Sequence, residues 1–193
     1  MKVNEIFYSL QGEGAFTGRP AVFVRFAICN LRCPFCDTHF STYKEMSETE
    51  IVDAVSALSD KCHFVVLTGG EPTLQVNDKL INLLQMNGFF VAMETNGTNP
   101  VPYNVNWITC SPKEGFAKGG KVRLTHCNEL KLVFDDKHDV SDYNIVADHY
   151  YLQPCDTGIQ EENDRILRKC VEYIKKNPKW KLSLQTQKII GVQ

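Results

Sequence analysis

Three cysteines near the N-terminus have the clearest capacity for chemistry. They stand in CNLRCPFC, residues 29–36, at the spacing C-x3-C-x2-C. Three thiols in one loop leave three kinds of site open: a zinc site, a reactive-thiol site, and an iron–sulfur cluster with one iron not bound by protein.

The number of ligands separates these alternatives. Structural zinc takes four ligands, usually in two Cys/His pairs, and neither His39 nor His63 completes a recognised spacing. A thiol–disulfide pair of Cys33 and Cys36 leaves Cys29 without a role. Three thiolates around four irons leave one iron open, where a substrate or cofactor can bind. The spacing therefore favours a cluster with an open iron.

Four more polar motifs follow apolar, strand-like runs, as the cysteine motif does. They are TGGEP at residues 68–72, ETNG at 94–97, SPK at 111–113 and QPCD at 153–156. In parallel α/β architectures the carboxyl ends of the strands share one edge of the sheet, and ligands bind there. We therefore expect all five motifs to converge on one pocket.

The elements that position these motifs are predicted from hydrophobic patterning. Strand-like runs occupy residues 21–28, 63–67, 89–93, 107–110, 129–134, 149–152 and 180–185. Helices are predicted after the capping box SETE at 47–50, over 78–86 with Asn87–Gly88 ending it, and over 161–176. This alternation predicts an α/β fold with a parallel sheet or an open barrel.

Composition limits the possible classes of protein. A length of 193 residues suggests one domain, and a net charge of −2 gives no positive field to attract nucleic acid. The N-terminus lacks a signal-peptide pattern, and no window approaches eighteen consecutive apolar residues, so neither secretion nor membrane insertion is expected. We expect a cytoplasmic protein whose eight cysteines are thiols or metal ligands. The five isolated ones, predicted to be small buried side chains, are Cys62, Cys110, Cys127, Cys155 and Cys170.

The cysteine spacing, with Phe35 before the last cysteine, and the TGGEP turn together resemble the radical S-adenosylmethionine (SAM) superfamily. The resemblance implies that SAM chelates the open iron. One electron from the cluster would then cleave SAM to methionine and a 5′-deoxyadenosyl radical. The glycines of TGGEP would let the backbone approach the methionine part of SAM, and Glu71 would accept a hydrogen bond from its ammonium group.

A closer resemblance covers nearly the whole chain. The segment EIFYSLQGEGAFTGRPAVFVRFAICNLRCPFCDT, with METNGT, ELKLV, YLQPCD and LSLQTQKIIG, is similar to the 7-carboxy-7-deazaguanine synthase family of queuosine and 7-deazapurine biosynthesis. That family converts 6-carboxy-5,6,7,8-tetrahydropterin to 7-carboxy-7-deazaguanine with loss of ammonia, using a [4Fe–4S] cluster, SAM and Mg²⁺. The resemblance implies a single domain over residues 1–193, folded as an incomplete TIM-like barrel of about six parallel strands with a reduced helical side. It also implies a homodimer and a reducing partner such as flavodoxin or ferredoxin.

The resemblance assigns roles by position. The cluster ligands would be Cys29, Cys33 and Cys36, and Thr38 would bind Mg²⁺. The SAM site would comprise Phe35, Cys36, Asp37, Gly70, Glu71, Ser111, Pro112, Lys113, Gln153, Pro154, Cys155 and Asp156. The substrate site would comprise Leu10, Gln11, Gly12, Arg25, Thr68 and Gln193, the last through its backbone, and Glu94 would act in catalysis.

Several of these positions also have simpler interpretations. Arg25 offers a two-pronged donor for the substrate carboxylate, but a charge in an apolar strand can also reach solvent or pair with a glutamate. Thr38 can be an ordinary loop hydroxyl. Glu94 would bond the SAM ribose or move a proton, but it can also be an ordinary turn carboxylate. Glu13, beside the segment that would bind the pterin, is a weaker candidate than Glu94 for a role in catalysis. Gln187 stands where members of the family often have histidine.

Three rival functions follow from the same residues. A glycyl-radical activase shares the cysteine spacing and GGEP, but leaves SLQGEG, Arg25 and Thr38 without a use. A zinc-stabilised binding module would contain zinc without sulfide. Direct binding of tRNA is disfavoured by the slightly acidic composition.

Overall fold

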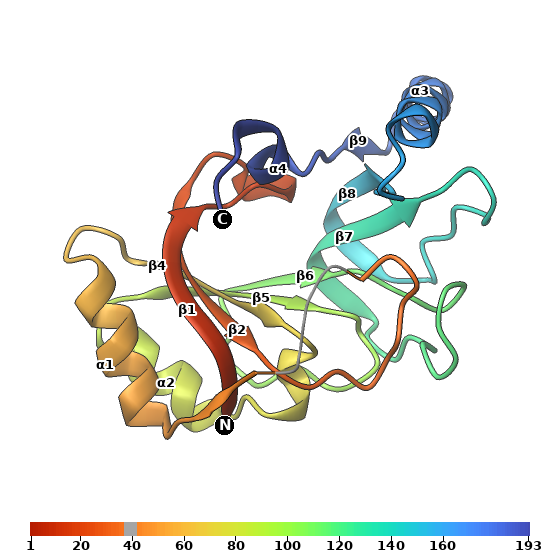
Figure 1. The fold of residues 1–193 in the computed structure, drawn as a ribbon. Coiled ribbons are helices and arrows are strands. Elements are labelled where there is room, and N and C mark those ends of the chain that lie inside the picture. The colour runs from red at the N-terminus through yellow and green to blue at the C-terminus, as the bar shows by residue number, and fades with distance from the viewer. Residues whose placement is uncertain (37–41) are drawn as a thin grey trace.

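A single open sheet organises the protein. The computed structural model describes residues 1–36 and 42–193, and within these residues nine strands form one sheet in the order β3-β1-β2-β4-β5-β6-β7-β8-β9 (Figure 1). The strands are β1 (Lys2–Leu10), β2 (Pro20–Phe26), β3 (Lys44–Glu45), β4 (Phe64–Gly69), β5 (Phe90–Thr95), β6 (Trp107–Cys110), β7 (His126–Phe134), β8 (Val146–Pro154) and β9 (Lys181–Leu182).

The parallel part of the sheet confirms the fold prediction. Strands β2 and β4 to β9 run parallel to one another, whereas β1 is antiparallel to both β2 and β3. The sheet curves without closing, since β3 and β9 are its two edges. All carboxyl ends of the parallel strands therefore face one side, as an incomplete barrel requires.

Helices cover the outer side of the sheet incompletely. They are α1 (Glu48–Leu58), α2 (Asp78–Met86), α3 (Gln160–Lys176) and α4 (Thr186–Ile190), with short 3₁₀ turns η1 (Gly14–Phe16) and η2 (Pro72–Leu74). The described connections β5–β6, β6–β7 and β7–β8 contain no helix, which confirms the reduced helical side. The predicted capping box begins α1: Ser47 Oγ accepts from the Glu50 N–H, and the Ser47 N–H donates to Glu50 Oε2 at 2.8 Å.

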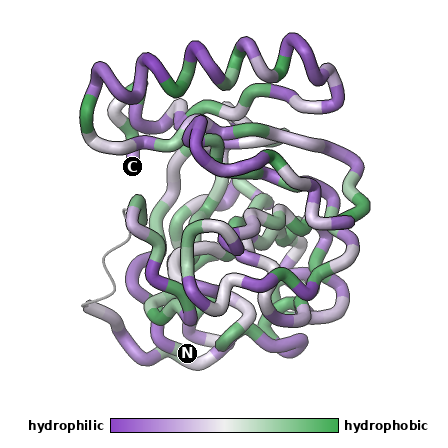
Figure 2. Tube along the Cα trace, turned by 90° about the vertical axis from the view of Figure 1, so that its right-hand side faces the viewer, coloured by the Kyte–Doolittle hydropathy of each residue, from purple (hydrophilic) through white to green (hydrophobic). Residues whose placement is uncertain are grey.

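Two apolar clusters lie against the sheet. The larger packs α1 and α2 on β2, β4 and β5, through side chains such as Val24, Leu67 and Leu80 that have no exposed surface. The smaller packs α3 on β7 and β8, through Leu130 and Ile166. Helix α3 crosses one end of the molecule with a mostly hydrophilic surface (Figure 2). No helix in residues 1–36 and 42–193 is long and apolar enough to cross a membrane.

Two parts of the sheet differ from the sequence prediction. Strand β1 was not predicted, because its side chains are half-buried without a clear alternation. The predicted strand over 180–185 was too long, since β9 ends at Leu182. Ser183 then turns inward, accepting from the Gly14 N–H and donating to Gln153 Oε1, both at 3.0 Å.

Candidate active site

Two adjoining cavities open at the carboxyl ends of the parallel strands. One has a volume of about 260 Å³ and contains Cys29, Cys33 and Cys36 in its wall; we call it the thiol cavity. The other, of about 170 Å³, has Arg25 in its wall; we call it the arginine cavity. Both are lined by five common residues, Glu13, Thr68, Gly69, Glu94 and Gln185, so one wall separates the two spaces.

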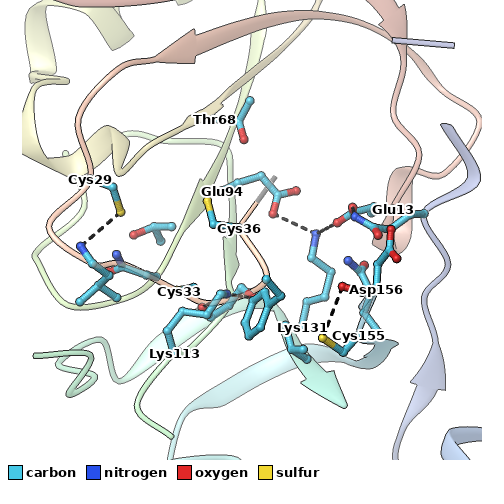
Figure 3. Close-up of a pocket in the computed structure, with 18 of the residues that line it drawn as sticks. Glu13, Cys29, Cys33, Cys36, Thr68, Glu94, Lys113, Lys131, Cys155 and Asp156 are labelled. Atoms are coloured by element: carbon cyan, nitrogen blue, oxygen red, sulfur yellow. Dashed lines mark hydrogen bonds and ion pairs between the residues drawn. The ribbon is translucent and has the colours of Figure 1, made fainter. Parts of the chain in front are cut away.

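The five motifs predicted to converge do so in the thiol cavity. Each contributes at least one residue to the wall, for example Cys33, Gly70, Glu94, Lys113 and Asp156. Figure 3 shows Cys33, Glu94, Lys113 and Asp156 reaching this cavity from separate segments of the chain. The argument from strand ends is therefore confirmed.

The loop that carries the three cysteines is held by its neighbours. The Leu31 N–H points at Cys29 Sγ, 3.4 Å away, and the Cys36 N–H donates to the Cys33 carbonyl at 3.2 Å. Asn30 binds the loop after β5 through Thr98 Oγ1, at 2.8 Å, and through the Asn96 amide. The thiol positions thus depend on a second motif distant in sequence.

The double glycine of TGGEP has a structural role that the sequence did not indicate. A Cβ on Gly70 would lie 1.9 Å from the Ile28 carbonyl oxygen, and Gly69 has φ +104°. Ile28 has a φ of 81°, unusual for a β-branched residue, and its carbonyl accepts from the Glu71 N–H at 2.9 Å. The glycines therefore let the TGGEP turn approach the backbone at the start of the cysteine loop.

Glu71 is almost fully buried, at 1% exposure, and both of its carboxylate oxygens are in use. Oε1 accepts from the Thr73 N–H, from Thr73 Oγ1 at 2.6 Å and from Thr95 Oγ1 at 2.7 Å. Oε2 accepts from the Asn96 N–H at 2.7 Å. Glu71 lines the thiol cavity, but these four bonds make it a link between the turn after β4 and the loop after β5.

The donor set of the thiol cavity fits a cluster better than a single ion. Within residues 1–36 and 42–193, no three Cys, His, Asp or Glu side chains are close enough together to hold one metal ion. In a cubane cluster, each thiolate binds a different iron, so the sulfurs stand apart around a common space. Cys29, Cys33 and Cys36 have this arrangement: they share one cavity wall without forming a compact set.

A row of charges forms the wall between the cavities (Figure 3). Lys131 Nζ lies 2.7 Å from Glu13 Oε2 and 3.0 Å from Glu94 Oε2, and Gln11 Nε2 donates to Glu94 Oε1 at 3.2 Å. Burial alone would raise the pKa of Glu13, but the Lys131 charge and hydrogen bonds lower it to about 2. Burial likewise opposes the charge of Lys131, yet its carboxylate neighbours hold its pKa above the ordinary value. The lysine and Glu13 are therefore both ionised at neutral pH.

Sequence analysis missed Lys131 and its neighbour Glu129. Glu129 is 2% exposed and accepts from the Ala15 N–H at 2.8 Å. Burial raises the pKa of Glu129 to about 7, although the charge of Lys131 opposes that rise. The sequence did contain a signal for Lys131: like Arg25, it is a charged residue within an apolar strand-like run, here ELKLVF.

The arginine cavity brings together all six residues predicted to bind substrate. Its wall includes Leu10, Gln11, Gly12, Arg25, Thr68 and Gln193. The alternative interpretation of Arg25, a pair with a glutamate, is confirmed, since Arg25 Nη1 lies 2.7 Å from Glu5 Oε1. The two interpretations are compatible because the guanidinium has more than one edge.

Residues near the C-terminal end of the chain complete this cavity. Thr186 donates its N–H and its Oγ1 to the Gly12 carbonyl, at 3.0 and 2.8 Å. Gln185 and Gln187 donate to Glu13 Oε1 at 3.0 and 3.3 Å. A Cβ on Gly12 would lie 1.7 Å from Gln187 Oε1 and 2.9 Å from the Gln187 backbone nitrogen, so a larger residue would displace this segment. In the described part of the chain, that buried Gln187 oxygen has no hydrogen-bond partner.

The remaining predicted residues divide into three groups. Phe35, Ser111, Gln153, Pro154 and Cys155 line the thiol cavity. Pro112 is buried but is not part of its wall. Asp37 and Thr38, predicted to bind SAM and Mg²⁺, lie outside the described residues. Asp156 lines the thiol cavity and pairs with Lys188 at 2.8 Å, which with further hydrogen bonds lowers its pKa to about 2.

Comparison with known proteins agrees with this geometry. The model of the radical SAM superfamily matches residues 23–123. A 7-carboxy-7-deazaguanine synthase of Bacteroides thetaiotaomicron is 46% identical, covering 100% of this chain and 98% of the relative. The enzyme of that name from Haemophilus influenzae is 39% identical, covering 99% of this chain and 93% of the relative. The crystal structure of QueE from Escherichia coli superposes with a TM-score of 0.75 at 28% identity, covering 95% of this chain and 92% of that one.

These similarities extend over both cavities, not only over the residues near the cysteines. The chain belongs to the 7-carboxy-7-deazaguanine synthase family of radical SAM enzymes.

Proposed function

We propose that the protein converts 6-carboxy-5,6,7,8-tetrahydropterin to 7-carboxy-7-deazaguanine with loss of ammonia, as a step of 7-deazapurine biosynthesis. One observation carries the proposal: a cavity with three thiols shares a wall with a second cavity that presents an arginine. A radical generated in one space can reach a substrate held in the other only if the two adjoin.

The thiol cavity holds the cofactors in this proposal. Cys29, Cys33 and Cys36 bind a [4Fe–4S] cluster, whose open iron and bound SAM supply a 5′-deoxyadenosyl radical. The polar residues of the SPK and QPCD motifs surround SAM, and Lys113 is fixed by Ser111, with its Nζ 2.6 Å from both the carbonyl and Oγ of that serine. Glu71 acts by holding two loops in place, since its oxygens already accept four hydrogen bonds.

The arginine cavity holds the pterin. Arg25 binds the substrate carboxylate with the part of its guanidinium that Glu5 does not occupy. Leu10, Gln11 and Gly12 offer backbone and amide groups to the donors and acceptors of the pterin ring. Glu94, Glu13 and Thr68 all line both cavities. Within the described residues, Glu94 accepts two hydrogen bonds and Glu13 accepts three, so Glu94 is the carboxylate with more capacity left to contact the reacting atoms.

Family resemblance adds four features to the proposal: Mg²⁺ bound by Thr38, SAM binding by Asp37, a homodimer, and electron supply by a flavodoxin or ferredoxin. A single domain over residues 1–193 and a cytoplasmic location also belong to the proposal, and they follow from length and composition. A reducing compartment suits eight cysteines that act as thiols or cluster ligands.

The test is an anaerobic assay with reconstituted cluster, reductant, SAM, Mg²⁺ and the tetrahydropterin, read by mass spectrometry. Wild type and Cys62→Ala, which alters a buried thiol of the large apolar cluster, should form 7-carboxy-7-deazaguanine and retain iron and sulfide. Cys33→Ala should lose product, iron and sulfide together.

Two outcomes would contradict the proposal at different levels. Cleavage of SAM without change to the pterin would refute the substrate, and a glycyl-radical activase would then be the better assignment. Stoichiometric zinc without sulfide would refute the cluster itself.

A further inference from the structure

Glu5 contacts Arg25 from the neighbouring strand rather than from within the cavity. The two residues face each other across the antiparallel pair β1–β2, directly after an irregularity of the β1 register between Val3 and Glu5. Such an irregularity changes the direction in which a side chain points. Glu5 is not part of the wall of the arginine cavity, whereas Arg25 is.

The guanidinium of Arg25 is held on one edge and one face. Glu5 Oε1 binds Nη1 at 2.7 Å, and the ring of Phe7 lies 5.2 Å from the guanidinium carbon. Phe7 is itself stacked on Phe23, with ring centroids 5.0 Å apart and an interplanar angle of 11°. Among the described residues, no acceptor binds Nη2 or Nε of Arg25. The geometry leaves one edge of a planar, two-pronged donor available to a carboxylate.

Glu5 also binds the segment that closes the cavity. Gln193 Nε2 donates to Glu5 Oε2 at 2.5 Å, and Ser9 Oγ donates to the Gln193 carbonyl at 2.6 Å. Gln193 is part of the wall of the arginine cavity. One carboxylate therefore fixes two elements of the same wall.

We propose that Glu5 is a positioning residue, which orients the free edge of Arg25 and the Gln193 segment toward the carboxylate of the substrate. The proposal rests on the proposed function, because it takes a carboxylated pterin as the ligand. It requires the reach and the charge of Glu5 toward Arg25, and its second oxygen toward Gln193.

Three substitutions separate reach from charge. Glu5→Ala removes both oxygens, Glu5→Asp keeps the charge but withdraws it by one methylene, and Glu5→Gln keeps the reach but loses the charge and one of the two oxygens that contact Arg25 and Gln193. Losing the ion pair that orients a ligand-binding group should raise KM for the carboxypterin about tenfold in all three variants, with kcat within about threefold. Glu45→Ala, on the exposed edge strand β3, is the matched control.

A tetrahydropterin without the 6-carboxyl group, used as a competitive inhibitor, supplies a second readout. Its inhibition constant should be equal in all variants, because Arg25 has nothing to bind on it. Thermal unfolding, measured in parallel, identifies any variant that does not fold; Glu5→Asp then carries the comparison in place of Ala.

Two outcomes would overturn the inference: an unchanged KM in all three variants, or equal weakening of both pterins. Failure of the wild-type enzyme to act on the carboxypterin is a separate result that refutes the proposed function instead.

Discussion

The thiol cavity and the arginine cavity differ in how their walls are built. Loops that each follow a buried parallel strand form most of the thiol cavity. Backbone hydrogen bonds join these loops to the neighbouring strand ends, as from the Glu71 N–H to the Ile28 carbonyl and from the Ser111 N–H to the Thr95 carbonyl, and the Glu71 carboxylate adds a side-chain link. The arginine cavity joins residues 7–25 to residues 185–193, mainly through side-chain contacts with Gly12, Glu13 and Glu5. Substitutions in the two walls should therefore have separable effects, except in the row of charges that they share.

Lys131→Met should have the largest effect and should damage both cavities. It would leave Glu13 and Glu94 facing each other without their buried partner, which typically costs about 3–5 kcal/mol of unfolding free energy. Urea denaturation measures this loss, and binding assays should show weaker affinity for SAM and pterin alike. Lys179→Met is the control, since its pair with Asp142 is 44% and 43% exposed and should contribute less than about 1 kcal/mol. Equal stability of the two variants would mean that the ion pairs of Lys131 do not stabilise the wall between the two cavities.

Glu129→Gln should change how stability depends on pH. Because the folded-state pKa is raised from 4.5 to about 7, the wild-type protein should lose stability as pH rises through that window, by roughly 3 kcal/mol at most. Gln keeps an acceptor for the Ala15 N–H but does not titrate, so this decline should vanish. Glu13, with a folded pKa of about 2, affects only the acid side, where stability falls as pH drops below 4.5. Unfolding free energies measured from pH 4 to 8 test the difference. A variant with the same slope as wild type would exclude Glu129 as the cause.

Glu71→Gln should affect the thiol cavity selectively. In the variant, the amide N–H₂ of glutamine would replace one carboxylate oxygen and face hydrogen-bond donors. This should lower the free energy of unfolding by about 2 kcal/mol. The loops after β4 and β5 would lose their link, so SAM affinity should fall more than pterin affinity. Isothermal titration with each ligand provides the comparison, with the exposed Glu172→Gln as a control that should change neither. Equal loss of both affinities would show that the two walls are not independent.

Thr186→Val should give the smallest effect, confined to the arginine cavity. It removes the Oγ1 bond to the Gly12 carbonyl but keeps the backbone bond, so stability should fall by only about 1 kcal/mol. KM for the pterin should rise a few-fold while SAM affinity stays unchanged. Thr186→Ser, which keeps the hydroxyl, should behave as wild type. If Thr186→Val altered the affinity for SAM, the two cavities would not be separable in this way.

The difference in how the two cavity walls are built also explains which parts of the site could be predicted from the sequence. Helices α1 and α2 and the five motifs are local patterns, and each was recognised from adjacent residues. Lys131 contacts Glu13 across 118 positions, and Gln185 contacts Glu13 across 172, so no local pattern shows that these charges are satisfied inside the protein. The contacts of the arginine cavity were therefore accessible only through family resemblance. Resemblance in turn could not show that Glu71 is committed to protein donors, or that Glu5 binds Arg25.

The contacts of Gln193 also impose an order of events on folding. Its bonds to Glu5 and Ser9 span 188 and 184 positions, the kind of non-local contact that forms slowly because a long loop must close first. During synthesis, strands β2 and β4 to β8 can assemble before residues 183–193 leave the ribosome. The cysteine loop and the strand ends around it can thus form while the arginine cavity is incomplete, and residues 185–193 complete the wall of that cavity afterwards.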